Sequence, residues 1–260
     1  MTQTFTLTFG NCAENHKGMQ KIGCELKEGF TFDEICEMYY MFEGLGAKLE
    51  LYDLNGMLPE GIETDNAYLL VIRNGLDVLL GCGFKDKLFD EQKELKKDDK
   101  AYMYGRVVNK KARYNLCFSD FDQVADYENK KGTVINFKNL PLLNELREKL
   151  MKVIDSEKVK GLQCEGNYYY DVKNTYIGFH GDAERHIVIA ARLGADFPSY
   201  YQWYYKNEKI SGLFEVMLSH GDMYVMSDKA VGRDWKKKNI PTLRHAACAK
   251  DNKNVFRKKQ

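Results

Sequence analysis

Polar and apolar positions alternate at the start of the chain, where residues 4–9 read Thr-Phe-Thr-Leu-Thr-Phe. A period of two is typical of a β-strand. Thr31 is followed three residues later by Glu34, a capping-box pattern that predicts a helix over residues 31–40. Residues 49–54 and 67–74 are apolar runs ended by Asn-Gly turns, and we expect both to be strands. These elements predict a small N-terminal α/β domain over residues 1–95.

Residues 89–100 carry many charges of both signs, so we interpret them as a solvated helix and linker, with a domain boundary near residue 95. Beyond it, the pattern changes to short apolar runs separated by turn residues, which is typical of a β-sandwich or jelly roll. One helix is expected at 142–157, where apolar residues recur at 143, 146, 150 and 154. Strands are expected at 102–108, 114–118, 132–137, 166–170, 175–179, 187–193, 200–205, 213–218, 223–226 and 242–247. The fold class predicted for the whole chain is α+β.

The overall charge is nearly balanced, with 39 basic and 38 acidic residues among 260. A net charge of +1 argues against electrostatic binding of nucleic acid through the overall charge of the molecule. Two local segments are basic. Residues 106–113 (RVVNKKAR) hold four basic residues and no acidic one, and residues 229–260 hold eleven Lys or Arg against two Asp. Any binding of nucleic acid is therefore expected to be local.

The chain shows no apolar run near the roughly 18 residues that a spanning helix needs, and its first residues do not resemble a signal peptide. No membrane partner is expected. The seven cysteines are odd in number and none forms a CxxC pair. We interpret them as reduced thiols, and we expect an intracellular location in the cytoplasm or nucleus.

His180 and Asp182 are the first candidates for chemistry. They are two residues apart in the segment Ile-Gly-Phe-His-Gly-Asp-Ala-Glu over residues 177–184. On an extended segment both side chains point to the same face. An imidazole and a carboxylate so placed supply two ligands for a metal. A second histidine from a distant strand would complete the 2-His-1-carboxylate set of non-haem Fe(II) enzymes.

The order of the surrounding motifs resembles the AlkB-like branch of the Fe(II)/2-oxoglutarate dioxygenases, over about residues 100–260. The motifs, in chain order, are Asn-Tyr-Tyr at 167–169, the His-x-Asp-x-Glu of 180–184, an apolar strand ending in Leu-Gly at 193–194, Gly-Asp at 221–222, Leu-Arg-His at 243–245, and a final strand with Asn-Val-Phe-Arg at 254–257. The resemblance implies a double-stranded β-helix (jelly-roll) oxygenase domain over residues 96–260. Residues 1–95 have no counterpart in it.

The resemblance also implies roles for individual residues. His180, Asp182 and His245 would bind Fe(II), and Asn167 and Tyr169 would hydrogen-bond the co-substrate 2-oxoglutarate, which is consumed with O2. Arg257 would pair with a carboxylate of that co-substrate, a task that suits a planar guanidinium.

Two departures from the family pattern leave alternatives open. An insertion over about residues 228–241 precedes His245, and a different placement of the gap would put Trp235 at the ligand position. At the end of the chain, the family often has two arginines six residues apart, whereas only Arg257 fits here. Arg244 is a second candidate for the carboxylate, although its neighbour His245 would place it on the opposite face of the strand.

The resemblance implies oxidation of methyl groups on nucleobases, by dealkylation or hydroxylation. Glu184 occupies the position of the acidic residue that reads the base. Arg113 and Tyr114 are candidates for phosphate contact and base stacking. The expected partner is single-stranded or locally opened nucleic acid, bound through residues 106–113 and 229–260.

Two alternatives remain. The first is the same chemistry on a protein side chain or a small metabolite, and the second is a non-catalytic binding protein with this fold. Of the other histidines, His186 and His220 are expected to be ordinary surface or hydrogen-bonded residues. The polar run 11–16, which ends in His16, is a weaker candidate to line a site.

Overall fold

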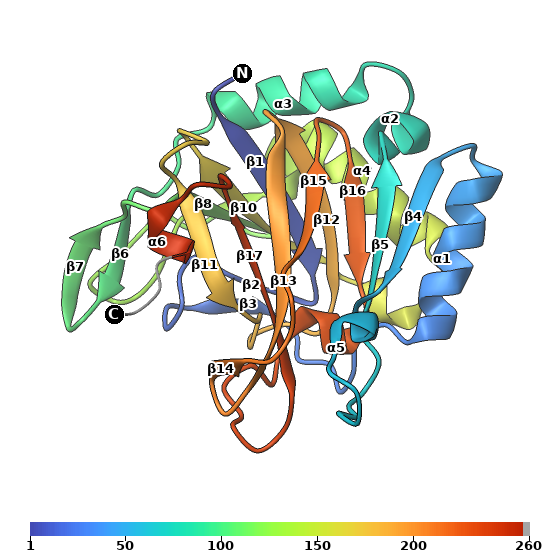
Figure 1. Cartoon of the computed structure of the whole chain (residues 1–260). Helices are drawn as coiled ribbons and strands as arrows, with labels where there is room; N and C mark the ends of the chain where they lie inside the picture. Colours follow the sequence, from blue (N-terminus) through green and yellow to red (C-terminus); the bar gives the residue numbers. More distant parts are fainter. Residues whose placement is uncertain (257–260) are drawn as a thin grey trace.

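Two β-sheets face each other in the computed structural model, which describes residues 1–256 (Figure 1). The structure is mixed α/β and consists mostly of sheet. The larger sheet has eight strands, and only the last pair in its spatial order is parallel. In spatial order these strands are β4 (Lys48–Asp53), β5 (Tyr68–Arg73), β16 (Met223–Met226), β12 (Val188–Gly194), β1 (Thr4–Gly10), β10 (Gln163–Tyr169), β8 (Tyr114–Ser119) and β9 (Val134–Asn136).

The smaller sheet lies in front of the larger one in Figure 1. Its strands are β11 (Tyr176–His180), β17 (Thr242–Cys248), β13 (Phe197–Tyr205), β14 (Glu208–Lys209) and β15 (Phe214–Leu218), and both β14 and β15 pair with β13. Two hairpins stand apart from these sheets: β2 (Cys12–Glu14) with β3 (Lys21–Gly23), and β6 (Lys100–Met103) with β7 (Arg106–Asn109).

The helices are α1 (Phe32–Gly44), α2 (Gly75–Leu80), α3 (Phe84–Glu94), α4 (Pro141–Val153), α5 (Asp228–Val231) and α6 (Lys253–Phe256), with short 3-10 turns at Leu54–Met57, Phe137–Asn139 and Glu157–Val159. Helix α1 begins where the capping box predicts, because the side chain of Thr31 accepts from the Glu34 amide and the Glu34 carboxylate accepts from the Thr31 amide.

The two faces of the larger sheet are chemically different, as the alternation in β1 predicts. Phe5, Leu7 and Phe9 join a hydrophobic core with α1 to α4, which cover that face. Burial of each such side chain stabilises the folded state by about 1.5–3 kcal/mol relative to leaving it exposed. The threonines of β1 point the other way, toward the smaller sheet. In the antiparallel ladder Thr6 lies opposite both Asn167 and Arg192, so that β10, β1 and β12 present a polar row on this face.

The first 95 residues are not a separate sheet. Strand β1 pairs on one side with β10 and on the other with β12, and β5 pairs with β16. A boundary near residue 95 therefore divides strands that are hydrogen-bonded within one sheet. Local sequence patterns do not reveal this arrangement, because they predict strands but not the partners of those strands.

Two local predictions also need correction. The charged segment at 89–100 begins inside α3, where Phe84, Leu88 and Phe89 are buried against the larger sheet, so that helix is part of the core and not a linker. The final strand expected at 254–257 is instead the short helix α6 over its described part. Val255 and Phe256 pack on the outer face of the smaller sheet, against Tyr200 and Phe179. Arg257 itself lies outside the described residues.

Among residues 1–256, every helix is too short or too polar to cross a lipid bilayer.

Candidate metal centre and its cavity

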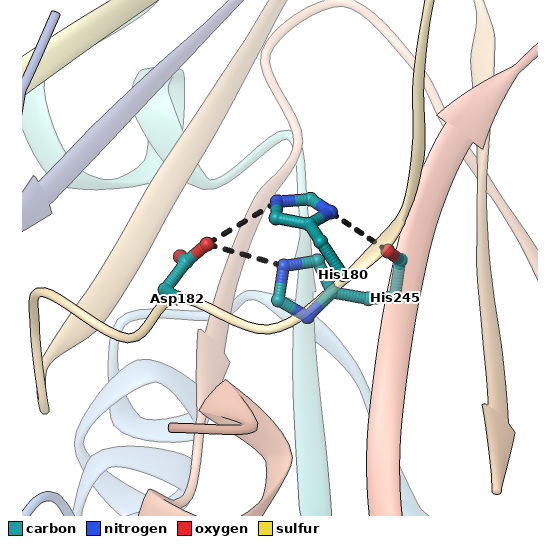
Figure 2. Close-up of side chains that lie close together, drawn as sticks. All are labelled: His180, Asp182 and His245. Atoms are coloured by element: carbon teal, nitrogen blue, oxygen red, sulfur yellow. Dashed lines mark hydrogen bonds and ion pairs between the residues drawn. The ribbon is translucent and has the colours of Figure 1, made fainter. Parts of the chain in front are cut away.

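His180, Asp182 and His245 are brought together by the smaller sheet. His180 ends β11 and lies directly opposite His245 on β17, after a register shift that follows Ile177. Asp182 lies just beyond the strand, where its amide donates to the carbonyl of Val231. Gly181 allows this close approach, because a Cβ there would lie only 1.9 Å from the Gly232 carbonyl oxygen. The three side chains point toward one another (Figure 2).

The ligand atoms of these three residues all lie within 4.8 Å of one another. Asp182 Oδ1 is 3.3 Å from His180 Nε2 and 3.5 Å from His245 Nε2. His180 Nδ1 lies 2.8 Å from the carbonyl oxygen of Gly178 and 3.0 Å from that of His245. Both of these partners are acceptors, so Nδ1 carries the proton and Nε2 presents a lone pair. The imidazole is thereby held with Nε2 toward Asp182.

The protonation of the cluster suits metal binding. Burial would by itself raise the pKa of Asp182, but the charge of Arg185 and the neighbouring imidazoles of His180 and His245 hold it well below its usual range. Burial, together with the neighbouring His180, lowers the pKa of His245. At neutral pH the cluster therefore offers a carboxylate and a neutral His245 imidazole, the forms that bind divalent metals.

These residues line a cavity of about 570 Å³ between the two sheets. The polar row of the larger sheet forms its opposite wall, with Thr6, Asn167, Tyr169 and Arg192. Asn167 accepts hydrogen bonds through Oδ1 from Arg113 Nε at 2.6 Å and from Asn115 at 2.5 Å. The structure thus places Asn167, Tyr169 and Arg113 in the same cavity as the His-Asp-His cluster.

Glu184 also lines the cavity, but a buried arginine engages it. Arg185 donates to Glu184 Oε1 from Nε at 3.0 Å and from Nη2 at 2.8 Å. Arg185 also pairs with Glu165 and lies 3.7 Å from Asp182 Oδ2. Glu184 is therefore part of an ion-pair network that supports the cluster. Only its second carboxylate oxygen has no hydrogen bond to residues 1–256.

The other predicted contacts lie outside the cavity. Tyr114 packs against Tyr170, with ring centroids 4.6 Å apart and ring planes tilted by 31°, and is not among the lining residues. Arg244 points to the outer face of β17, where its guanidinium carbon lies 4.2 Å from the Tyr204 ring centre and Nη2 donates to Asn207. The alternation along the strand predicts this outward direction.

Trp235 lines the cavity, but it is His245, and not Trp235, whose side chain lies within 4.8 Å of the ligand atoms of His180 and Asp182. Lys17, on the turn between β2 and β3, approaches Trp235 with its ammonium 5.0 Å from the ring centre. Two loops that are distant in the sequence therefore meet at one edge of the cavity.

Two of the remaining histidines lie outside the cavity, as expected, and the third lines it. His186 pairs with Asp228 at 2.8 Å and His220 with Asp86 at 3.1 Å, so both have hydrogen-bonding roles. His16 lines the cavity, and burial lowers its pKa. The polar run 11–16 does therefore contribute to the site.

The basic segments are less exposed than their sequences indicate. Within 106–113, Lys110 is buried and donates to Asn15, while Arg113 lies inside the cavity. In the described part of 229–260, Lys229 is buried and pairs with Asp234 at 2.7 Å. The exposed lysines Lys236–Lys238 follow Trp235 directly.

Several residues that line the cavity were not singled out individually from the sequence, among them Glu14, Arg185 and Arg192. Glu14 accepts from the Gly18 amide at 2.8 Å, and burial, followed by the charge of Glu184, raises its pKa to about 7. Arg192 is the single charged residue in the apolar run of residues 187–193. A charged residue at such a position is a signal of function that could have been found.

No protein-family model matches the chain. An uncharacterized protein of Acanthamoeba polyphaga mimivirus is 47% identical to it over 247 residues, which cover 94% of this chain and 95% of the viral protein. Identity at this level over nearly the full length of both proteins establishes a common family. The chain belongs to the family of this mimivirus protein.

Proposed function

We propose that the protein is an Fe(II)/2-oxoglutarate-dependent dioxygenase that oxidises methyl groups on nucleobases. The observation that carries the proposal is the cluster of His180, Asp182 and His245 at the wall of a cavity between two sheets. Two imidazole nitrogens and one carboxylate oxygen form the donor set of non-haem Fe(II) oxygenases, which leaves metal positions open for other ligands.

The order of strands supports a double-stranded β-helix. Along the chain, β10 lies in the larger sheet, β11 in the smaller, β12 in the larger, β13 and β15 in the smaller, β16 in the larger and β17 in the smaller. An eight-stranded roll needs one further strand in the larger sheet. Strand β1 occupies that place, between β10 and β12. On this interpretation the first strand of the chain closes the roll, in place of a strand after β17.

The residues of this chain fit the metal and have definite tasks toward it. His180 and His245 would each coordinate through Nε2, and Asp182 through a carboxylate oxygen. The carbonyls of Gly178 and His245 hold the His180 ring in position, and Arg185 holds the carboxylate of Asp182 ionised. When bound, Fe(II) and 2-oxoglutarate would supply the oxidation of a C–H bond by O2, with succinate and CO2 as products.

A nucleobase suits the other residues around the cavity. Glu14 has a pKa of about 7, so its carboxyl group can donate to or accept from the edge of a base near neutral pH. Lys17 and Lys236 are exposed and lie beside Trp235, where they can meet a phosphate. Lys110 and Lys229 are buried and cannot take part in such a surface, so the proposed contact with nucleic acid is local to this edge.

Succinate formation tests the proposal. Purified protein with Fe(II), ascorbate, O2 and 2-oxoglutarate is expected to form succinate, and methylated oligonucleotides are expected to stimulate this reaction. His180→Ala and Asp182→Ala should each abolish it. His186→Ala is the matched control, because this histidine lies outside the cavity and pairs with Asp228.

Each other outcome points to a different function. Turnover that survives both ligand substitutions would contradict the metal assignment. Turnover that only a free metabolite or a peptide stimulates would favour a non-nucleic substrate. The absence of both bound iron and succinate would favour a binding protein.

A further inference from the structure

Arg192 is a buried cation at the cavity wall opposite the His-Asp-His cluster. It lies on β12, directly opposite Thr6 of β1, and only 1% of its surface is exposed. Its side chain belongs to the face of the larger sheet that lines the cavity. The polar row that contains Arg192 also contains Asn167 on β10.

The hydrogen-bond partners of this guanidinium are neutral. Nη1 donates to Thr6 Oγ1 at 2.6 Å and Nη2 approaches Ser199 Oγ at 3.4 Å, while Nε has no partner among residues 1–256. The other two buried arginines are compensated, since Arg147 pairs with Asp120 and Arg185 with Glu165. Within the described part of the chain, Arg192 alone of the three lacks a carboxylate.

An uncompensated buried charge is unfavourable. Removing an ion from water costs several kcal/mol unless an opposite charge and hydrogen bonds replace the lost hydration. An anionic ligand in the cavity would supply both. A carboxylate fits best, because a guanidinium can donate two parallel hydrogen bonds to its oxygens.

The distance between Arg192 and the His-Asp-His cluster limits the length of an acid that could contact both. Ser199, which Arg192 approaches, lies on β13 two residues before Tyr201, and Tyr201 lies opposite His245. Two residues along a strand span about 7 Å. A short diacid could therefore reach from the His-Asp-His cluster to Arg192 with one carboxyl group at each end.

We propose that Arg192 binds the distal carboxylate of a 2-oxo diacid co-substrate, and that Thr6 of the N-terminal strand positions its guanidinium. This inference rests on the proposed function. It departs from the resemblance, which implies Arg257 for this task, because the residues just before Arg257 form α6 on the outer face of the smaller sheet. It also gives the start of the chain a role, since β1 supplies the hydroxyl that holds Arg192.

Binding without turnover tests the proposal. The protein is loaded with Mn(II) under anaerobic conditions, and calorimetry measures its affinity for 2-oxoglutarate and for 2-oxobutyrate, which lacks the distal carboxylate. The wild type is expected to prefer 2-oxoglutarate by about 10- to 100-fold, the range for hydrogen bonds to a charged group. Arg192→Met should lose this preference, and its affinity for 2-oxobutyrate and for Mn(II) should stay unchanged.

Further variants separate positioning from general damage. Thr6→Val should reduce the preference several-fold, whereas Thr6→Ser keeps the hydroxyl and should restore it. Arg106→Met is the matched control, because this arginine is exposed on the β6–β7 hairpin. Unchanged Mn(II) binding shows that each variant has folded.

The outcomes are distinguishable. If the wild type binds both acids equally, or if Arg257→Met removes the preference while Arg192→Met keeps it, the inference fails and the proposed function stands. If the wild type binds neither Mn(II) nor a 2-oxo acid, both fail.

Discussion

Removal of Arg185 should destabilise the protein strongly, because this guanidinium compensates the carboxylates behind the His-Asp-His cluster. Its side chain is 3% exposed, and that of its partner Glu165 is 8% exposed. It also donates twice to Glu184 and lies close to Asp182. Arg185→Met would leave these carboxylates buried without their cation.

The size of the effect follows from this arrangement. Breaking a buried ion pair by removing one partner costs about 3–5 kcal/mol. For a chain of this length, 1 kcal/mol corresponds to a change in Tm of about 2–4 °C, so the variant is expected to melt about 6–20 °C lower. A second substitution, Glu165→Gln, should recover part of the loss in the double variant, because it removes one of the uncompensated charges.

The measurement is urea unfolding followed by circular dichroism, with a chelator present so that metal binding does not contribute to stability. Arg106→Met serves as the control and should change stability by less than about 0.5 kcal/mol. A loss below about 1 kcal/mol for Arg185→Met, or a double variant no more stable than the single one, would refute the view that the network depends on this cation.

Three further outcomes are expected. The pKa of Glu14 rises from 4.5 to about 7 on folding, so the stability that its proton contributes is lost as pH rises from 4.5 through 7. Between pH 5 and pH 8, Glu14→Gln should therefore gain about 1 kcal/mol of stability relative to the wild type, after allowance for solvent screening. Thermal unfolding of both proteins measures this, and a Tm difference that is equal at the two pH values would contradict it. Cys24 is exposed and Cys164 fully buried, so a thiol reagent should label Cys24 rapidly and Cys164 only on unfolding, as mass spectrometry can show; equal rates would contradict the burial. Leu146→Ala in α4 should cost about 2–5 kcal/mol in urea unfolding, while Glu145→Ala on the exposed face should cost little, and similar losses would contradict the packing of α4.

Local features of the fold were predictable from the sequence. The capping box at Thr31 and Glu34 specifies the start of α1, and the alternation in residues 4–9 specifies a strand with one apolar and one polar face. These signals depend on residues close together in the chain, so a sequence contains them directly. The spacing of His180 and Asp182 is equally local, since Asp182 follows immediately beyond the end of β11.

The tertiary structure decided which of these parts meet. Strand β1 lies between β10 and β12, and this pairing sets Thr6 against Arg192 across 186 residues of sequence. Packing also decided which charges are available, because Arg185 engages Glu184 and burial removes Lys110 from the surface. Strand partners and ion pairs depend on which distant residues fold together, and local sequence patterns do not identify those residues. The sequence by itself therefore determined the local elements and the spacing of His180 and Asp182, while the tertiary structure determined the cavity that surrounds them.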